Sequence, residues 1–416
     1  MFNLTIITMK MKNFNLALLL AASLAFGACS NNEEIKVSEV TLGITLPALS
    51  EGTITLKSGT YTFTNISNGL ETPVDYAGTQ VTLPDGLYNV SFIGKADLTT
   101  AQTTEVNVQG IQQNVSVTGG AMNLAITLHI RNANEQGNFV IAEVFSGGTI
   151  HPTTNKAYNG DQYIRIYNNS NQTLYADSLI LLESEFVTTR KQDYTPNIMG
   201  EAMTVQAIAM IPGNGKQHPI APGAYITLCD NATDHSIENS NSLNLSTADF
   251  EWYTGSTNAN YPDIDNPAVP NLDMIYNYTK TIWVLTKQGN RAYAIGRLPK
   301  GVTPQNYLKD YTYDCHYTLA NGNPTKEFKY YKFPNSWIID AVNMSPKNSY
   351  VWNVVDASLD MGFTYINAMN STIENAGKAV VRKIAYKEDN RDVLQDTNNS
   401  TVDFTPSVRA TLLPKH

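Results

Sequence analysis

Alternation of apolar and polar residues at every second position runs through much of this 416-residue chain. Residues 40–46 alternate valine, leucine and isoleucine with threonine and glycine, and Tyr88, Val90 and Phe92 share one face after a Pro-Asp-Gly turn at 84–86. A period of two is that of a β-strand with one buried face, and no helical period of 3.6 competes with it here. The pattern therefore predicts an all-β protein of strands joined by short turns.

Strands of this kind continue over residues 36–130 and predict a first small β-sandwich. Within it, "LPDGLYNV" (83–90) resembles the L-P-x-G-x-Y-x-V stretch of transthyretin-like and carboxypeptidase-regulatory-like modules. The resemblance implies an immunoglobulin-like sandwich that acts as a spacer more often than as a receptor. The polar segment 131–138 that follows has no apolar period and is interpreted as a linker.

The remaining residues, 139–416, predict a second and larger β-sandwich. Its strand-like segments include "FVIAEVFSGGT", "QYIRIYNNSNQTLYADSLILLES" and "IAPGAYITLCD", and "TIWVLTKQGNRAYAIGRL" predicts a hairpin about residues 287–290. In this order, with the closing segment 380–407, they resemble the lamin-tail fold, which is also immunoglobulin-like. The match requires long loop insertions with little regular structure, which are residues 186–219, 230–278 and 302–350.

The N-terminus has the features of a secretion signal. Two lysines precede an apolar run at 16–26, which is about eleven residues long and too short to cross a bilayer of about 30 Å. Residues 1–28 are therefore interpreted as a signal peptide. The small residues that end it precede Cys29, and this arrangement resembles the lipobox of bacterial lipoproteins, which implies a lipid attached at Cys29.

The tether 29–35 carries the acidic stretch "SNNEE", which resembles the export signal of Bacteroidetes surface lipoproteins. Attached acyl chains anchor a protein by about 0.8 kcal/mol per buried methylene. We therefore expect an outer-membrane protein, held to the membrane by its lipid anchor and facing the cell exterior. Whether translation starts at Met1, Met9 or Met11 stays open.

The net charge narrows the class of binding partner. The formal charge of −9 falls to about −11 once the two lysines of residues 1–28 are removed, and no basic run provides a nucleic-acid footprint. We expect no nucleic acid among the partners.

Cys229 and Cys315 could form one disulfide in an oxidising compartment, or could stay as two separately buried thiols, and the sequence leaves both possibilities open.

Catalytic and metal-binding signatures are missing from the sequence. "GNGK" (213–216) lacks the spacing of a phosphate-binding loop, no G-x-S-x-G elbow occurs, and "HSIEN" (235–239) is not H-E-x-x-H. Single histidines are expected on the surface or in loops: His129, His151, His218, His235, His316 and His416. We expect no enzyme activity, no catalytic residues, no cofactor and no metal site.

Two further concentrations of residues have a functional and a structural interpretation. Acidic residues gather between 230 and 273, where they could hold Ca²⁺ or simply be solvated loop carboxylates. Aromatic residues gather in the same segment around Trp252, and again at 311–317 and 328–333. Their faces suit sugar rings, porphyrins or partner proteins, or could form a small core for the insertions. The loop 394–404 is interpreted as backbone-capping Asx and Ser/Thr turns rather than as an active loop.

The block that begins "LNLSTADFEWYTG" (243–255) resembles an uncharacterised family of Bacteroidetes lipoproteins, a domain of unknown function. The combined expectation is a non-catalytic binding or accessory lipoprotein, for nutrient capture with a TonB-dependent outer-membrane transporter. The alternatives are an adhesin or fimbrial surface protein, and a hydrolase whose active site is not recognised. The ligand, its binding residues and the oligomeric state are not determined by the sequence.

Overall fold

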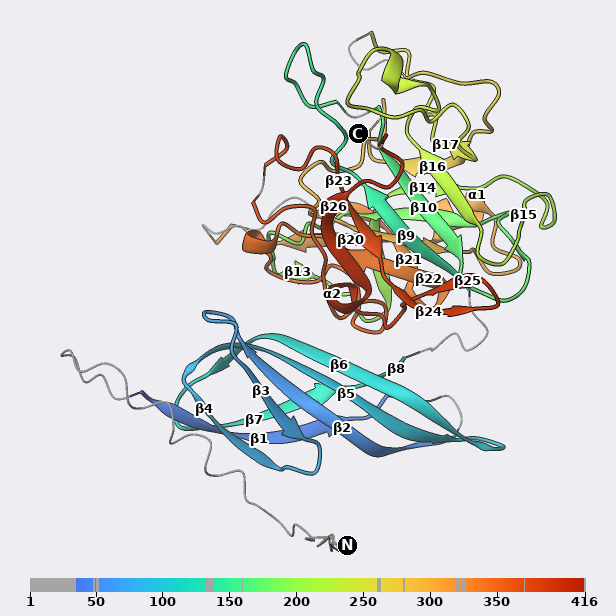
Figure 1. Cartoon of the computed structure of the whole chain (residues 1–416). Coiled ribbons are helices and arrows are strands. Elements are labelled where there is room, and N and C mark those ends of the chain that lie inside the picture. The colour runs from blue at the N-terminus through green and yellow to red at the C-terminus, as the bar shows by residue number, and fades with distance from the viewer. Residues whose placement is uncertain are drawn as a thin grey trace, which may run out of the picture.

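The computed structural model describes residues 35–47, 49, 52–131, 138–158, 160–259, 263–279, 281–318, 322–323, 327–369 and 371–414. The signal peptide, Cys29 and His416 lie outside these residues. Two β-sandwiches make up the described chain, so the prediction of an all-β fold is confirmed (Figure 1). Its helices are short: α1 (Pro304–Asp310), α2 (Ser400–Asp403) and the 3-10 turns η2 (His235–Ile237), η3 (Asn335–Trp337) and η4 (Lys347–Ser349). Over the described ranges, no helix has the length and apolar content needed to span a membrane.

The first sandwich consists of a three-stranded and a five-stranded sheet, shown in blue and cyan in Figure 1. The smaller sheet contains β4 (Gln80–Pro84), β1 (Val37–Thr45) and β7 (Ala121–Thr127), in this order. The larger sheet contains β3 (Glu71–Asp75), β2 (Thr53–Asn65), β5 (Gly86–Thr99), β6 (Thr103–Val117) and β8 (His129–Arg131). Tyr88, Val90 and Phe92 of β5 are buried between the sheets, as their alternation predicts.

The second sandwich is larger and packs a six-stranded sheet against a sheet of eight strands. The first has the order β17 (Phe250–Glu251), β16 (Tyr225–Cys229), β10 (Tyr163–Asn168), β9 (Phe139–Phe145), β23 (Lys378–Arg382) and β26 (Phe404–Arg409). The second has the order β13 (Tyr194–Thr195), β20 (Thr312–Tyr317), β21 (Phe328–Pro334), β14 (Ala202–Met210), β12 (Ile180–Ser184), β19 (Ala292–Gly296) and β22 (Ile338–Asn343). A further strand, β18 (Asp273–Asn277), pairs with β14, and two ribbons join β11 (Leu174–Tyr175) to β15 (Pro219–Ile220) and β24 (Ile384–Glu388) to β25 (Arg391–Leu394).

Segments expected to be irregular insertions instead build much of the eight-stranded sheet. The segment 186–219 contains β14, and 302–350 contains β20, β21 and β22. The expectation of long, poorly structured loops is therefore wrong for these two segments. β14 was hidden because its residues are buried on both faces, so its sequence "AMTVQAIAM" lacks the alternation of a half-exposed strand.

The hairpin expected about residues 287–290 also forms only in part. β19 is a strand, whereas residues 282–286 belong to no strand. Their backbone pairs instead with the side chain of Gln162, which accepts from the Leu285 amide at 2.9 Å and donates to the Leu285 carbonyl at 2.9 Å. This side chain replaces the neighbouring strand and satisfies buried backbone groups that would otherwise be unpaired.

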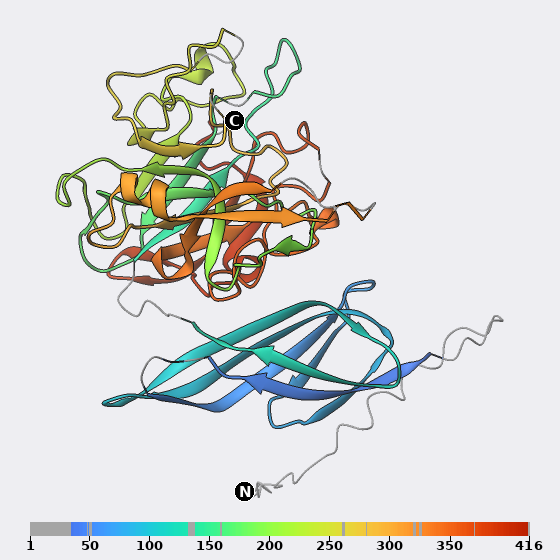
Figure 2. The ribbon, with the colours of Figure 1, turned by 180° about the vertical axis from the view of Figure 1, so that it is seen from behind.

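The two sandwiches lie against each other, the first below the second in Figure 1 and again in the reverse view of Figure 2. Hydrogen bonds from β6 to the loop 350–357 connect them, including one from the Asn114 side chain to the Val351 carbonyl at 3.2 Å. The first sandwich is thus docked on the second by specific polar contacts.

Candidate functional site

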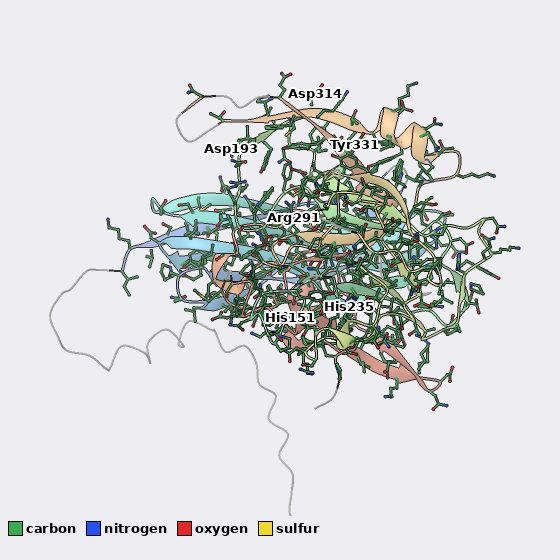
Figure 3. The ribbon with its side chains drawn as sticks, turned by 90° about the horizontal axis from the view of Figure 1, so that it is seen from above. His151, Asp193, His235, Arg291, Asp314 and Tyr331 are labelled. Carbon is green, nitrogen blue, oxygen red and sulfur yellow. The ribbon has the colours of Figure 1, made fainter. Side chains whose placement is uncertain are left out.

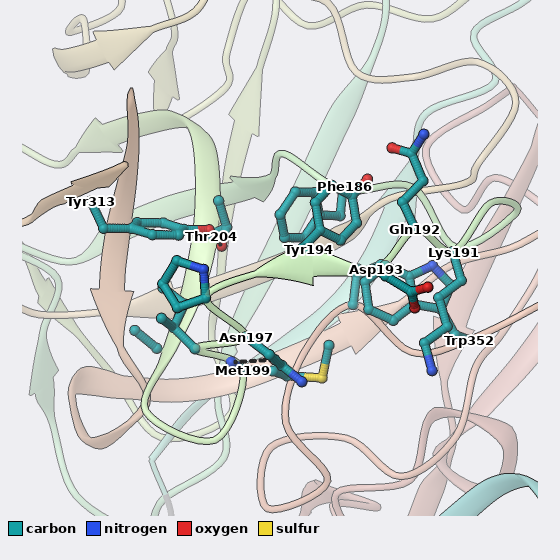
Figure 4. A pocket seen from close by; sticks show the side chains of 14 residues that line it. Phe186, Lys191, Gln192, Asp193, Tyr194, Asn197, Met199, Thr204, Tyr313 and Trp352 are labelled. Carbon is teal, nitrogen blue, oxygen red and sulfur yellow. Dashed lines mark hydrogen bonds between the residues drawn. The ribbon is translucent and has the colours of Figure 1, made fainter. Parts of the chain in front are cut away.

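A cavity of about 200 Å³ opens on the eight-stranded sheet side of the second sandwich, and we refer to it as the aromatic pocket (Figure 4). The segment 186–204 forms most of it, β20 contributes one side chain, and the loop after η4 contributes two. Its lining residues are Phe186, Lys191, Gln192, Asp193, Tyr194, Pro196, Asn197, Ile198, Met199, Ala202, Thr204, Tyr313, Trp352 and Val354.

Three aromatic rings form one wall of the aromatic pocket. Phe186 and Tyr194 stack with ring centroids 3.8 Å apart, and Tyr194 lies nearly parallel to Trp352 at 6.1 Å. The indole nitrogen of Trp352 donates to the carbonyl oxygens of Val187 (2.9 Å) and Arg190 (3.0 Å). Because these bonds fix the orientation of the indole, Trp352 offers the cavity an apolar ring rather than a hydrogen-bond donor.

Two hydroxyl groups lie on the opposite side of the cavity in Figure 4, where Tyr313 and Thr204 are bonded to each other at 2.7 Å between Oη and Oγ1. Burial raises the pKa of Tyr313 well above its ordinary value, and burial raises the pKa of Tyr194 to about 12. Both phenols therefore remain neutral near neutral pH. They contribute ring area and hydroxyl groups, but no charge.

Polar side chains at the mouth of the aromatic pocket keep hydrogen-bonding groups that are not used by the described residues. Among the described residues, the side chains of Lys191, Gln192 and Asp193 make no hydrogen bond or ion pair. Asn197 accepts from the Met199 amide at 3.1 Å through Oδ1, which leaves its NH₂ group available. The mouth thus carries both hydrogen-bond donors and hydrogen-bond acceptors, together with one positive and one negative charge.

Further aromatic residues continue from the aromatic pocket along the hairpin of β20 and β21. Tyr317 contacts Tyr194 edge-on at 5.5 Å, and its ring is parallel to that of Phe328 at 6.2 Å. Phe328 is in turn parallel to Tyr330 at 5.8 Å. These rings come from the segments 311–317 and 328–333, so the sequence did locate part of the site. They also pack on one another, as the structural interpretation expects.

Trp252, at the centre of the aromatic residues of the segment 230–278, has a structural role. Trp252 is fully buried in the core of the second sandwich, 5.2 Å from Trp283 between ring centroids. Its indole nitrogen donates to the Trp283 carbonyl at 3.0 Å. Trp252 therefore stabilises the packing of the segment 230–278 and offers no face to a ligand.

The acidic residues of the segment 230–278 are only partly solvated. The expectation of exposed loop carboxylates is wrong for Asp230 and Glu251, which are buried. Glu251 accepts from the backbone amides of Ala232 (2.8 Å) and Asn266 (2.7 Å), and thereby holds the loop together. Burial, with the neighbouring carboxylates, raises the pKa of Asp230 well above its ordinary value. No group of three histidine, cysteine, aspartate or glutamate residues is placed to hold a metal ion within the ranges that the structure describes.

His235 lies in a loop segment, in the 3-10 turn η2, which is one of the two expected locations, but it is buried. Its Nε2 lies 2.8 Å from the Asn231 carbonyl oxygen, so it donates, and its Nδ1 lies 2.7 Å from the Tyr158 hydroxyl. Viewed from above in Figure 3, His235 and His151 lie far from Asp193, which marks the mouth of the aromatic pocket. These imidazoles therefore have no part in the aromatic pocket.

Both cysteines are buried and unpaired. Cys229 lies in β16 of the six-stranded sheet, whereas Cys315 lies in β20 of the other sheet. Of the two possibilities that the sequence leaves open, the structure shows separate thiols.

The loop 394–404 caps backbone groups, as interpreted from its sequence. Asn399 is the N-cap of α2 and accepts from the Thr401 amide at 3.1 Å. Asp403 accepts from the amide of Thr397 at 2.8 Å and from its hydroxyl at 2.7 Å. These bonds fix the turn before β26.

The segment 186–204, with Phe186, Tyr194 and the polar residues 191–193, was missed by sequence reasoning. It lies in the insertion 186–219, and the insertions together are expected to form a binding face, but none of its residues stands out from the sequence. The signal available in "FVTTRKQDYTPN" was a polar, charged stretch between two aromatic residues.

The fold and site define a two-sandwich β-protein with a small aromatic pocket, and comparisons with known proteins agree with this architecture. Residues 221–411 match the model of a family described as "Protein of unknown function (DUF4876)". The crystal structure of a DUF4876 family protein from Bacteroides thetaiotaomicron VPI-5482 is similar with a TM-score of 0.56 and 23% sequence identity. The similarity covers 90% of this chain and 96% of that chain, and at this identity it shows the fold alone. No curated protein matches the sequence.

These findings confirm the predicted resemblance to a family of unknown function with a Bacteroides member. The transthyretin-like and lamin-tail-like resemblances of the two sandwiches remain predictions.

Proposed function

We propose that this chain is an outer-membrane lipoprotein, anchored through Cys29 and facing the cell exterior, that binds a small nutrient in the aromatic pocket. In this proposal it acts as a non-catalytic accessory protein that delivers the nutrient to a TonB-dependent transporter. The signal-like residues 1–28 and the acidic tether 29–35 support the location.

The observation that carries the binding role is the composition of the aromatic pocket. Three rings form an apolar wall, and three polar side chains at the mouth have no partner among the described residues. Ligand sites are typically concave and apolar, with a few convergent polar groups, and this arrangement fits that description.

The same lining argues against catalysis. Among the described residues, Asp193 is the one carboxylate that lines the aromatic pocket, and the lining includes no histidine, cysteine or serine. General acid–base catalysis of hydrolysis needs a second positioned group within reach of the first. Burial raises the pKa of Tyr194 and of Tyr313, so neither phenol can serve as the second group by acting as a base near neutral pH.

The direct test is to isolate the intact lipoprotein from native membranes and identify by mass spectrometry the small molecules that co-purify. Tyr194→Ala removes a ring that stacks on both other rings of the wall and should abolish co-purification. Tyr386→Ala removes an exposed ring from β24 and serves as the matched control. A ligand retained equally by both variants would contradict the assignment of the site.

The two alternatives predict different outcomes of the same preparation. A fimbrial or adhesive protein should run as high-molecular-weight polymers in mild detergent and should carry no small molecule. A hydrolase should release products from a substrate in a manner that Asp193→Asn abolishes. Binding without turnover by a monodisperse protein is the result that favours an accessory role.

A further inference from the structure

We propose that the aromatic pocket binds one uncharged sugar ring, an inference that rests on the proposed function and specifies its ligand. Size, charge and the distribution of apolar and polar groups in the cavity each restrict the class of ligand.

Size is the first restriction. The cavity of about 200 Å³ is smaller than the roughly 300–1,000 Å³ that is typical of sites for drug-sized molecules. A porphyrin, which the sequence left open as a ligand for aromatic surfaces, is too large for it. A single ring that carries hydroxyl groups is of the right scale.

Charge is the second restriction. Lys191 and Asp193 carry opposite charges at the mouth, and none of the described residues that line the aromatic pocket is an arginine. Tyr194 and Tyr313 stay neutral because burial raises the pKa of each. Recognition of a phosphate or carboxylate usually employs an arginine fork or a concentration of positive charge, and neither is present in this lining. The lining therefore favours a ligand without net charge.

The arrangement of groups is the third restriction. A sugar ring presents C–H groups on its faces and hydroxyl groups around its edge. The wall of Phe186, Tyr194 and Trp352 can pack against the C–H groups of the sugar face. The only donor of Trp352, its indole N–H, already bonds the backbone, so its ring offers an apolar surface. Gln192 and Asp193 suit the edge, since an amide and a carboxylate can each bond a pair of neighbouring hydroxyl groups. A purely apolar ligand would make no use of these polar groups.

The hairpin of β20 and β21 extends this surface beyond the cavity. Tyr317, Phe328 and Tyr330 lie in succession from the edge of the wall, and Phe328 is 39% exposed. If the sugar in the aromatic pocket is the end unit of a longer glycan, the next units can lie along these rings. We therefore expect a short oligosaccharide to bind more tightly than its end unit alone.

Saturation-transfer NMR of the mature protein with a panel of free hexoses, pentoses and N-acetylhexosamines tests the inference. At least one sugar should bind, and each of two variants should weaken its affinity about tenfold or more. Tyr194→Ala removes one ring of the wall. Asp193→Ala removes only an exposed side chain, so the effect of this second variant cannot come from loss of folding. Tyr386→Ala should bind as the unchanged protein does.

Other outcomes separate the ligand class from the proposed function. If no sugar of the panel binds but a membrane-derived molecule co-purifies in a manner that depends on Tyr194, the sugar assignment is overturned while the binding role stands. Binding of inorganic phosphate or haem at this cavity, blocked by Asp193→Ala or Tyr194→Ala, would also overturn it. If neither a sugar nor a native molecule depends on these residues, both proposals fail.

Discussion

Gln113 of β6 donates a hydrogen bond from its side-chain amide to the hydroxyl oxygen of Tyr350, across the boundary between the two sandwiches. Its own carbonyl oxygen accepts from the Asn353 amide at 3.2 Å, and the Tyr350 hydroxyl donates to Asn353 Oδ1 at 2.8 Å. The same loop carries Trp352 and Val354, which line the aromatic pocket. The first sandwich therefore supports one wall of the site, a role that its resemblance to spacer modules did not suggest.

Replacement of Gln113 by alanine should loosen this wall. The change removes two hydrogen bonds across the boundary, and water then pairs with the Tyr350 hydroxyl and the Asn353 amide. We expect the docking of the two sandwiches to weaken by about 1–3 kcal/mol. We expect the ¹⁹F NMR signal of Trp352 in fluorotryptophan-labelled protein to shift or broaden, with Trp352→Phe assigning the signal. Gln112→Ala, an exposed neighbour of the same type, is the control. An unchanged Trp352 signal in Gln113→Ala would show that the wall is held from the second sandwich alone.

Half-buried strands could be predicted from this sequence, because burial of one face imposes a period of two. Tyr88, Val90 and Phe92 are the clearest example. β14 escaped prediction because both its faces are buried, and the strand expected before residue 287 is replaced by pairing with the side chain of Gln162. Neither outcome is encoded in local periodicity.

The aromatic pocket could be predicted only in fragments. Tyr313 belongs to an aromatic segment visible in the sequence, but Phe186 and Trp352 are separated by more than half of the second sandwich. Their meeting depends on the order of strands in the eight-stranded sheet, which places 186–204 beside the loop after η4. Because residues far apart in the sequence form this pocket, no fixed spacing between them could serve as a sequence motif.

Replacement of Cys29 by serine should release the protein from the membrane. An acylated thiol provides anchoring in proportion to its buried methylenes, and serine cannot take its place in lipoprotein maturation. Labelled palmitate should be incorporated into the unchanged protein and into Cys315→Ser, but not into Cys29→Ser. If the protein faces the cell exterior, protease added to intact cells should digest the acylated form. Acylation of Cys29→Ser, or protection from the protease, would contradict the anchor or the orientation respectively.

The two remaining cysteines should behave as inert thiols. Burial raises the pKa of the Cys229 thiol and of the Cys315 thiol, which disfavours the reactive thiolate. Iodoacetamide should label neither thiol in the folded protein and both of them in guanidinium without reductant, as read by mass spectrometry. Labelling that requires prior reduction would show that a disulfide joins them.

Replacement of Arg382 by methionine should destabilise the second sandwich strongly. The buried guanidinium lies 2.5 Å from Asp340 and 3.3 Å from Asp396, and it donates to the Ile141 carbonyl at 2.7 Å. Loss of the positive charge leaves a buried carboxylate without compensation, which costs about 3–5 kcal/mol. Urea unfolding should show this loss, while the exposed Arg409→Met should change little. The double variant Arg382→Met/Asp340→Asn should recover part of the stability, and a loss below about 1 kcal/mol would contradict the argument.

Asp360 should make the stability of the second sandwich depend on pH. It is buried and accepts from the Asn343 amide (2.7 Å) and the Gly362 amide (2.9 Å), and it also bonds Ser400. Burial raises its pKa to about 6 despite these bonds, so the folded state binds the proton more tightly than the unfolded chain. Its contribution to stability is therefore greatest at low pH and is lost as pH rises from about 4 through about 6.

The measurement is the difference in unfolding free energy between the unchanged protein and Asp360→Asn, from urea titrations at two pH values. Between about pH 7.5 and about pH 5.5 this difference should shift by about 1 kcal/mol in favour of the unchanged protein. The subtraction cancels the titration of other buried carboxyl groups, which both proteins share. Asp310→Asn, at an exposed position at the end of α1, should show no such shift. A difference that stays constant with pH would mean that Asp360 remains ionised throughout, with its backbone donors outweighing its burial.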